Sequence, residues 1–509
     1  MTNSYITPSD FENPRKILKW LPKQSEEYWL EGVRNNAFKV FEILRDKIPF
    51  YKEFLKEHGV EINDIKNSQD IDMLPVMTKE NYLNKFGLEG LLNGKVEDIK
   101  SFYMSSGSSG KPGVWPRLEQ SNLAYAIFVN FFYTLYWDID VKKTLYISAM
   151  DLGIWASGNL QFHAATYCAH RHRFTFANSG ADFSFIYHIL KELGSYYDQV
   201  IIATYPSWAR RVLDYLLDKK DIDLKKLNIK LMLGGEPHTI EWRQFILKKI
   251  GHSEDGLTDV MDYYGTSDSG GPGSSTLLST LIQNLCEKDN LLCNDLFGQP
   301  IVPSLFQQNP TLYVEAVNGN IVITYPGQLP LCRYDSGDTG GVIKFSEVIK
   351  KLEKHDYDIN GLMSKYGYKN FIWKWPFVYL TGRYDLAINI GGAIVYPKDI
   401  EGLFFGDETK EINSFKLAVE SGEDQKYSFK VYLELKHNII LSSSEREKLI
   451  EKYTKIILNK LVESNLDYAA AYDMDKDLSK PDVNICNYRE PPFESEEIRQ
   501  KPLFVKKYN

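Results

Sequence analysis

Residues 144–265 contain three short apolar runs, TLYISA at 144–149, VIIAT at 200–204 and IKLML at 229–233. Longer stretches with a helical pattern lie between them, FSFIYHILKEL at 183–193 and WARRVLDYLLDKK at 208–220. Short apolar strands that alternate with helices are typical of a parallel sheet whose faces are covered by helices. This stretch therefore predicts an α/β fold.

The chain before residue 144 has a mainly helical pattern. Phe41, Leu44 and Ile48 fall at helical spacing, whereas Leu74-Pro75-Val76 interrupts the next helical region with an extended segment. Residues 123–137 are the most apolar stretch, but polar residues interrupt it, and a membrane span needs about 20 residues. We therefore interpret residues 123–137 as a helix of the core.

The chain after residue 265 changes to antiparallel strand patterns. Two β-rich runs flank Asn318-Gly319, a dipeptide that favours the two-residue turn of a hairpin. Further on, FKLAVE at 415–420 and YSFKVYLEL at 427–435 predict two more strands. A helix is expected to follow them, with Ser444 and Glu447 at the spacing of a capping box.

The composition of the 509 residues is that of a globular protein, with 43% hydrophobic and 25% charged residues. Sixty Lys and Arg against 68 Asp and Glu give a net charge of −8, which argues against a protein that coats nucleic acid. The N-terminus shows no apolar segment behind a positive start, so we expect a cytoplasmic protein. The five cysteines are expected to be free thiols.

The segment Ser105-Ser106-Gly107-Ser108-Ser109-Gly110-Lys111-Pro112 combines hydroxyl groups, glycines and one lysine. Glycines let backbone N–H groups approach phosphate oxygens, hydroxyls add donors and lysine adds positive charge, so such a loop can bind phosphates. A flexible linker is the alternative, because linkers share this composition. A Gly-x-x-x-x-Gly-Lys-Ser/Thr loop fits poorly, since it requires glycine at 105 and a hydroxyl residue at 112.

This octapeptide resembles the phosphate loop of the adenylate-forming enzymes, the acyl-CoA synthetase or AMP-binding superfamily. Further motifs follow in that family's order and extend the resemblance over nearly the whole chain: LGGEP at 233–237, DYYGTSD at 262–268, RYDSGD at 333–338 and residues 381–401. Within the superfamily the chain is most similar to phenylacetate–CoA ligases, on residues 48–60, 74–82 and 233–237. The resemblance implies a large N-terminal AMP-binding domain, residues 1–382, with parallel and antiparallel sheets, and a small mobile C-terminal α+β domain, residues 383–509.

The resemblance assigns nucleotide binding to Ser105, Ser106, Gly107, Ser108, Ser109, Gly110, Gly235, Glu236, Pro237, Asp262, Tyr263, Tyr264, Gly265, Thr266, Asp338 and Arg383. Gly234 and Gly235 directly follow an apolar run, and the carboxyl end of a strand is the usual ligand position in open α/β sheets. Tyr264 offers a ring face to adenine, and Asp338 offers two acceptors to ribose hydroxyls. The alternatives are a core tyrosine and a turn-forming aspartate.

The resemblance also indicates a metal ligand and an acid pocket. Asp268 stands where the family has a glutamate that binds Mg²⁺, and it is shorter by one methylene, although a carboxylate still suits this cation. Trp155, Phe162 and His163 resemble the stretch that borders the acyl group, and Gly234 is assigned to substrate binding with them. Their alternative role is ordinary core packing.

Three residues are catalytic by resemblance: Lys501, Lys111 and Asp385. Lys501 in QKPLFV at 500–505 resembles the adenylation lysine, although glutamine and phenylalanine replace the glycine and arginine of the family motif. Lys506 and Lys507 lie close enough to be alternatives, and an exposed lysine without a role is another. Asp385 matches the hinge about which the small domain rotates.

The implied activity is the ATP-dependent adenylation of a small carboxylic acid, expected to be aromatic, followed by acyl transfer to a thiol. ATP and Mg²⁺ are the expected cofactors and CoA the expected cosubstrate. An amine or an acyl-carrier protein as acceptor, and a noncatalytic nucleotide- or carboxylate-binding homologue, stay open as alternatives. Residues 343–379 are longer than in the family and could reshape the acceptor site or bind a carrier. We expect neither nucleic acid nor membrane as a partner, and a homodimer stays open.

Overall fold

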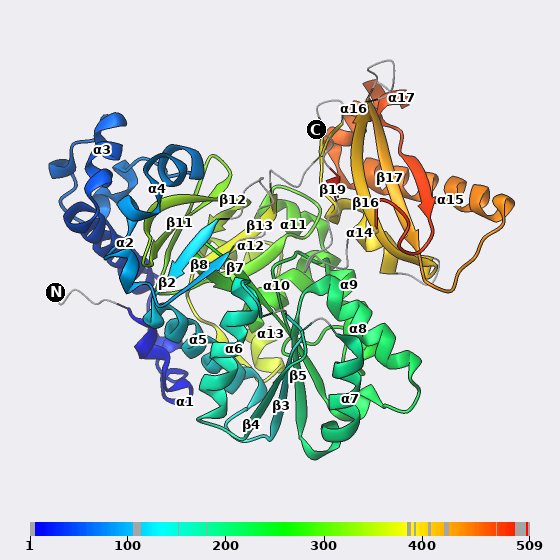
Figure 1. Cartoon of the computed structure of the whole chain (residues 1–509), viewed down its shortest axis with the longest axis horizontal. Coiled ribbons are helices and arrows are strands. Elements are labelled where there is room, and N and C mark those ends of the chain that lie inside the picture. Colours follow the sequence, from blue (N-terminus) through cyan, green and yellow to red (C-terminus); the bar gives the residue numbers. More distant parts are fainter. Residues whose placement is uncertain are drawn as a thin grey trace.

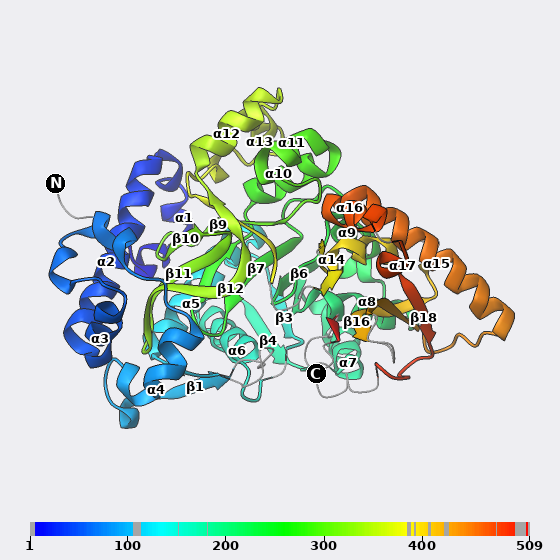
Figure 2. The same ribbon diagram turned by 90° about the horizontal axis from the view of Figure 1, so that it is seen from above.

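The computed structural model describes residues 6–104, 113–150, 152–180, 182–383, 388–390, 393–405, 409–421, 427–474, 476–493 and 505–506. These residues form a large part built on one mixed sheet and a smaller C-terminal part (Figure 1). The C-terminal part lies at the opposite end of the molecule from the N-terminal helices, as the view from above also shows (Figure 2).

Five strands form the parallel half of the large sheet: β4 (Phe174–Asn178), β3 (Thr144–Ser148), β5 (Gln199–Thr204), β6 (Ile229–Gly234) and β7 (Val260–Thr266). Their side chains alternate between two apolar clusters, because successive residues of a strand point to opposite faces. On β3, Tyr146 belongs to one cluster, and Leu145 and Ile147 belong to the other. The predicted parallel sheet is confirmed.

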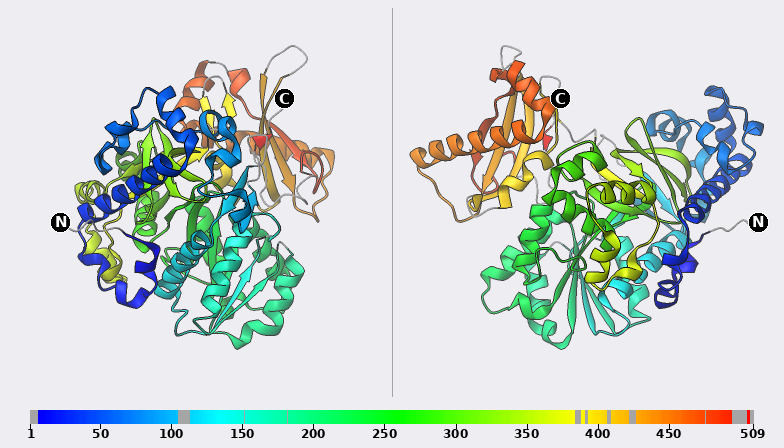
Figure 3. Two further views of the ribbon diagram at one scale, coloured as in Figure 1. Left: turned by 60° about the vertical axis from the view of Figure 1, so that its left-hand side comes forward. Right: turned by 180° about the vertical axis from the view of Figure 1, so that it is seen from behind.

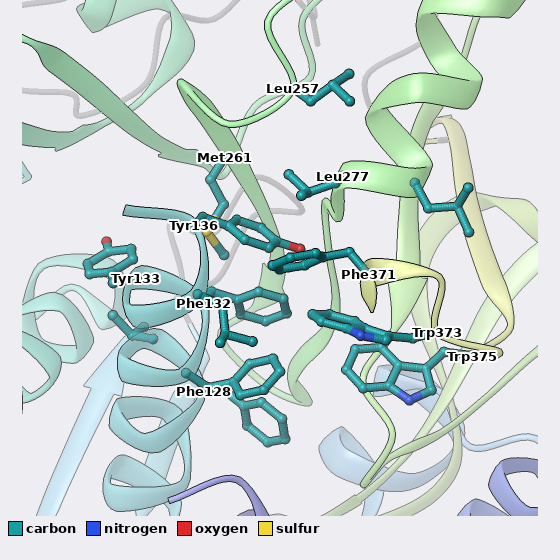
Figure 4. Packing of buried hydrophobic residues seen from close by; sticks show 14 of the residues in the cluster. Phe128, Phe132, Tyr133, Tyr136, Leu257, Met261, Leu277, Phe371, Trp373 and Trp375 are labelled. Carbon is teal, nitrogen blue, oxygen red and sulfur yellow. The ribbon is translucent and has the colours of Figure 1, made fainter. Parts of the chain in front are cut away.

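Helices cover both faces of this half. One face carries α7 (Phe183–Leu193), α8 (Pro206–Asp218) and α9 (Ile240–Lys249), and the other carries α5 (Glu119–Trp137), α6 (Ala156–Ala169), α10 (Leu277–Lys288) and α11 (Asn290–Phe297). Helix α5 confirms the predicted core helix, and Figure 4 shows its Phe132 and Tyr136 against Trp373 and Phe371. None of the described helices combines the length and hydropathy that a membrane span requires.

Six strands form the antiparallel half: β8 (Gly270–Ser274), β9 (Ser304–Gln308), β13 (Phe377–Arg383), β12 (Pro330–Ile343), β11 (Asn320–Pro326) and β10 (Tyr313–Val317). The order of the whole sheet is β10-β11-β12-β13-β9-β8-β7-β6-β5-β3-β4. The turn between β10 and β11 holds Asn318 at φ 52° and Gly319 at φ 80°, the positive values that a type I′ turn requires. The predicted hairpin is therefore confirmed.

Residues between β12 and β13 form α12 (Phe345–Lys354), α13 (Ile359–Lys365) and the short helix η9 (Lys369–Phe371). Apolar residues of these helices join the same cluster as α5 and α10. The long segment noted at 343–379 is thus a packed helical unit. Its role in acceptor binding stays a prediction.

The N-terminal region is mainly helical, as predicted, with α1 (Pro14–Ile17), α2 (Glu26–Lys47), α3 (Pro49–Glu57) and α4 (Asn84–Leu91). After the extended segment at Leu74-Pro75-Val76, the Met77 N–H donates to the Arg333 carbonyl and the Asp335 N–H donates to the Met77 carbonyl, both at 2.9 Å. Strands β1 (Ser101–Met104) and β2 (Val114–Arg117) pair antiparallel beside this region. Short helical turns connect these elements: η1 (Pro8–Phe11), η2 (Leu21–Lys23), η3 (Ile62–Asp64), η4 (Ser68–Met73), η5 (Lys79–Leu83), η6 (Val96–Asp98), η7 (Gly194–Tyr196) and η8 (Leu224–Leu227).

The C-terminal part has its own sheet and apolar cluster (Figure 3). Its sheet has the order β18-β17-β16-β19, from β16 (Ile412–Ser421), β17 (Tyr427–Leu435), β18 (Asp482–Cys486) and β19 (Val505–Lys506). The remaining elements are β14 (Ile388–Ile390), β15 (Ala393–Val395), α14 (Lys398–Glu401), α15 (Ser443–Ser464), α16 (Leu466–Met474) and α17 (Lys476–Ser479). The domain boundary between residues 382 and 383 stays a prediction, and β13 itself ends at Arg383.

The capping box of α15 differs from the sequence prediction. Ser442 and Glu445 form it, because the Ser442 Oγ accepts from the Glu445 N–H and the Glu445 carboxylate accepts from the Ser442 N–H. The predicted pair, Ser444 and Glu447, lies within the first turns of the helix instead. Three consecutive serines made the start of this helix ambiguous in the sequence.

The two parts of the chain meet at η10 (Gly402–Phe405), which lies against α9. The Arg210 guanidinium of α8 donates to the Phe404 carbonyl at 3.0 Å. A side chain added at Gly402 would lie 3.5 Å from the Glu241 carboxylate of α9. The chain therefore passes close to α8 and α9 of the large part immediately after Glu401.

Glu401 makes this junction sensitive to pH. Burial raises the pKa of Glu401 from its ordinary value of 4.5 to about 8, because the charged form loses its hydration. The folded chain therefore holds a proton that the unfolded chain releases, so stability falls as pH rises from about 4.5 through about 8. We expect the Tm of the wild type to fall across this range relative to that of Glu401→Gln, measured by thermal unfolding. The exposed control Glu97→Gln should follow the wild type, and parallel wild-type and Glu401→Gln profiles would contradict the prediction.

Candidate functional site

The candidate site lies at the carboxyl ends of β6 and β7, where the sheet changes from parallel to antiparallel pairing. Gly235 has φ 79°, and a side chain at Gly234 would lie only 3.1 Å from the Tyr263 carbonyl, so this turn keeps the backbone close to β7. Leu233 of β6 lies opposite Asp262 of β7. The LGGEP and DYYGTSD motifs are therefore neighbours in space.

Tyr264 and Asp338 are joined across the sheet. The Tyr264 hydroxyl donates to Asp338 Oδ2 at 2.7 Å, and both side chains are buried. Burial, with the Asp338 charge nearby, raises the pKa of Tyr264 well above its ordinary value, so the phenol keeps its proton and acts as donor. The Tyr264 ring also stacks on Phe306 of β9 at 5.6 Å. Since β8, β9 and β13 separate these two strands in the sheet order, the sheet must curl to bring the two residues together.

Asp268 is held immediately after β7 by two donors. The Tyr334 hydroxyl donates to its Oδ2 at 2.9 Å, and the Ser269 N–H donates to its Oδ1 at 3.0 Å. The residue before it, Ser267, accepts a hydrogen bond at its carbonyl from Arg117 of β2 at 2.6 Å. DYYGTSD, RYDSGD and the strand after the phosphate loop therefore meet at one place.

Asp262 forms the other end of the site. Its Oδ1 lies 2.7 Å from His238 Nε2, and its Oδ2 lies 3.9 Å from the buried guanidinium of Arg243. Burial favours the neutral ring and is the largest single effect, but the Asp262 charge and the hydrogen bonds to Asp262 and to the Thr239 carbonyl together outweigh it and raise the pKa of His238. For Asp262, burial opposes the charged form, and His238 and Arg243 lower its pKa nevertheless.

Four residues that hold this site were not predicted from the sequence: Arg117, His238, Arg243 and Tyr334. His238 directly follows the LGGEP motif and Tyr334 lies inside RYDSGD, so their positions beside known motifs could have indicated that they belong to the site. Arg117 and Arg243 lie outside every motif. Only the folded chain brings them to the carbonyls that they bind.

The predicted nucleotide residues are only partly described. Residues 105–112, including Lys111, and the catalytic candidates Asp385 and Lys501 lie outside the described residues. The backbone of Arg383 pairs with Asp338 between β13 and β12. The Tyr263 ring packs edge-on against Tyr125 at 5.1 Å, on the face of the sheet that α5 covers.

Of the predicted acid-pocket residues, Trp155 caps the start of α6, Phe162 and His163 lie in the middle of this helix, and Gly234 ends β6. Trp155 precedes this helix and bridges to Met104, the last residue before the phosphate loop. Phe162 is partly exposed, while His163 lies 3.4 Å from the Asn122 amide, and burial lowers the pKa of His163. A neighbouring cavity of about 390 Å³ is lined by other residues: Ile99, Lys100, Ser101, Phe102, Tyr103, Gly153 and Asn159.

Neither a protein-family model nor a curated protein sequence matches the chain. Among solved structures it is similar to 2-hydroxyisobutyryl-CoA ligase in the postadenylation state in complex with R3-HIB-AMP, at a TM-score of 0.61 and 15% identity, over 94% of this chain and 89% of that chain. The same ligase in an open conformation with 2-HIB-AMP and CoA gives a TM-score of 0.51 at 15% identity, over 94% and 91%. The chain has the fold of the adenylate-forming ligases. This confirms the predicted fold, whereas the particular similarity to phenylacetate–CoA ligases stays a prediction.

Replacing Tyr264 by phenylalanine tests whether the bond to Asp338 matters for nucleotide binding. If Asp338 holds the ribose, losing the hydroxyl donor leaves its carboxylate less well positioned, and ATP affinity should fall by ~1–2 kcal/mol in calorimetry. Tyr313→Phe is the matched control, because the Tyr313 hydroxyl also donates to a carboxylate, that of Asp72, at 3.0 Å. Equal ATP affinity in both variants would contradict a role for Asp338.

Proposed function

We propose that this protein is an AMP-forming acid–thiol ligase that activates a small carboxylic acid with ATP and transfers the acyl group to CoA. The observation that carries the proposal is the convergence of two motifs in one buried cluster. Tyr264 and Asp268 come from DYYGTSD, and Asp338 and Tyr334 come from RYDSGD. The adenylate-forming fold and the occupied states of the similar ligase support it.

In the first half-reaction, a carboxylate oxygen of the acid attacks the α-phosphorus of ATP. The new P–O bond forms as the bond to the bridging oxygen breaks, and pyrophosphate leaves with the electron pair. Asp338 binds the ribose hydroxyls and Tyr264 borders the adenine, so that the α-phosphorus is oriented toward the acid. Lys111 and Lys501 offset the charge that builds on the phosphates.

In the second half-reaction, the CoA thiolate attacks the carbonyl carbon of the acyl-adenylate. AMP is a good leaving group, whereas the oxygen of a free carboxylate is not, which is why adenylation must come first. The thioester forms as the acyl–phosphate bond breaks and AMP leaves. We assign the change between the two half-reactions to a rotation of residues 383–509 against residues 1–382 about Asp385.

The residues around Asp268 fit a Mg²⁺ ion. Its carboxylate is almost fully buried and held by neutral donors, Tyr334 and Ser269, and it forms no ion pair with a cation of the described residues. Mg²⁺ commonly binds one or two carboxylates together with substrate phosphates. When bound, the ion would add positive charge beside the phosphates, while Tyr334 keeps the carboxylate in place.

The similar ligase supports a moving C-terminal part. Two postadenylation structures of that ligase give TM-scores of 0.61 and 0.60, whereas its open form and its thioesterification state each give 0.51. Because the compared protein is the same, the difference reflects how its parts are arranged.

The acid is proposed to be aromatic, because Trp155 lies beside the strand that enters the phosphate loop and Phe162 follows on α6. ATP–pyrophosphate exchange across a panel of aromatic and aliphatic acids tests this. We expect ATP–pyrophosphate exchange with an aromatic acid in the absence of CoA. When CoA is added, we expect that acid to be converted to its CoA thioester.

Exchange without CoA-dependent turnover would instead favour an amine or a carrier protein as acceptor. ATP binding with no exchange for any acid would favour the noncatalytic homologue. Exchange confined to aliphatic acids would contradict the aromatic substrate but leave the adenylation intact.

Lys501 and Asp385 are expected to act in different half-reactions. Lys501→Ala should slow pyrophosphate release but leave transfer from a supplied acyl-adenylate nearly intact, since a contact accelerates only the step in whose transition state it forms. Asp385→Pro, which fixes φ near −65°, should spare adenylation and block transfer. Two single-turnover assays measure the two steps.

Lys506→Ala and Lys507→Ala are the controls for this pair. If either of them, rather than Lys501→Ala, loses pyrophosphate release, the adenylation lysine has been assigned to the wrong position. Equal loss of both steps in Asp385→Pro would contradict the hinge.

A further inference from the structure

Arg117 is a buried cation with no acidic partner among the described residues. It is 3% exposed, and it donates from Nη2 to the Ser267 carbonyl at 2.6 Å and from Nη1 to the Tyr325 hydroxyl at 3.0 Å. Its Nε has no hydrogen-bond partner in the part of the chain that the structure describes. The rings of Tyr103 and Tyr325 lie 5.5 and 6.0 Å from the guanidinium carbon, within the range of cation–π contact.

The other two buried arginines of the described chain each have a carboxylate nearby. Arg333 pairs with Glu315 at 2.7 Å, and Arg243 lies 3.9 Å from Asp262. A guanidinium keeps its charge in proteins, and burying a charge without a partner is costly. Arg117 thus differs from its counterparts in a way that core packing does not explain.

The position of Arg117 relates it to the phosphate-binding end of the site. It is the last residue of β2, the strand that follows residues 105–112, and Tyr103 lies on β1, which precedes them. Its bond to Ser267 fixes the residue directly before Asp268, while Tyr334 holds the Asp268 carboxylate itself. Two side chains from distant elements therefore fix one turn.

We infer that Arg117 is a positioning residue that fixes the Ser267–Asp268 turn for a nucleoside polyphosphate, whose negative charge balances the buried guanidinium. This inference rests on the proposed function, because it assumes that the site binds MgATP. A planar guanidinium makes both of its bonds at once, which the single ammonium of lysine cannot reproduce. A ligand without β- and γ-phosphates, such as AMP, should be indifferent to Arg117.

The test compares MgATP and AMP binding by calorimetry in the full chain. Arg117→Met should weaken MgATP about tenfold or more and change AMP affinity by less than about twofold, because only the polyphosphate end loses its support. Arg117→Lys keeps the charge, so its MgATP affinity should lie between those of the wild type and Arg117→Met. Thermal unfolding without nucleotide establishes that each variant is folded. If Arg117→Met does not fold, the same comparison of MgATP and AMP affinity is made with Arg117→Lys.

Arg243→Met is the matched control for general loosening of β7. Arg243 is equally buried and donates to two carbonyls, those of Val260 and Gly256, at 2.9 Å. Because these lie away from Asp268, its loss should change MgATP and AMP affinity by the same factor. If Arg117→Met also changes MgATP and AMP affinity by the same factor, Arg117 has only a structural role and the inference is overturned.

A double-mutant cycle tests whether Arg117 acts through Asp268. Arg117→Met combined with Asp268→Ala should bind MgATP within about twofold of Asp268→Ala alone, since the positioned group is already absent. Additive losses, or unchanged MgATP affinity in Arg117→Met, would overturn the inference while leaving the proposed function standing. Wild-type protein that binds neither nucleotide would overturn the proposed function, and this inference with it.

Discussion

Strand β7 pairs parallel to β6 on one edge and antiparallel to β8 on the other, and the geometry of the candidate site depends on this change. A short turn that carries the buried Asp268 joins β7 to β8 at this change. The bond from Tyr264 to Asp338 then ties β7 to β12. The curl of the antiparallel half thus brings the RYDSGD motif to the DYYGTSD motif.

Among the described residues, neutral or weakly basic groups donate the hydrogen bonds to the carboxylates of this site, although the Arg243 guanidinium also lies 3.9 Å from Asp262. Tyrosine hydroxyls bind Asp338 and Asp268, and a histidine binds Asp262. A hydroxyl donor fixes a carboxylate without cancelling its charge, which leaves that charge available to a sugar hydroxyl or a cation. The guanidinium of Arg117, which has no acidic partner within the described ranges, adds one fixed positive charge to this arrangement.

The junction between the two parts of the chain is built differently. Its contacts are the Glu241 carboxylate of α9 beside Gly402, the bond from Arg210 to the Phe404 carbonyl and the partly buried Glu401. These contacts are polar and do not form a continuous apolar cluster among the described residues. The apolar cluster of the C-terminal part contains residues of that part only. Contacts of this polar kind are compatible with relative motion, because separating them exposes little apolar surface.

The sequence by itself determined the local elements and the motifs. The parallel strands, the core helix α5 and the Asn318-Gly319 hairpin follow from periodicity and backbone preferences that act over a few residues. The predicted start of α15 was wrong by two residues, because adjacent serines can each cap a helix. Only the tertiary structure decided which polar groups meet: Arg117 and Ser267 are 150 residues apart, and Tyr264 and Asp338 are 74 apart. The second pair depends on how the large sheet curls and the first on how the β1-β2 hairpin packs beside that sheet, and no local preference encodes either arrangement.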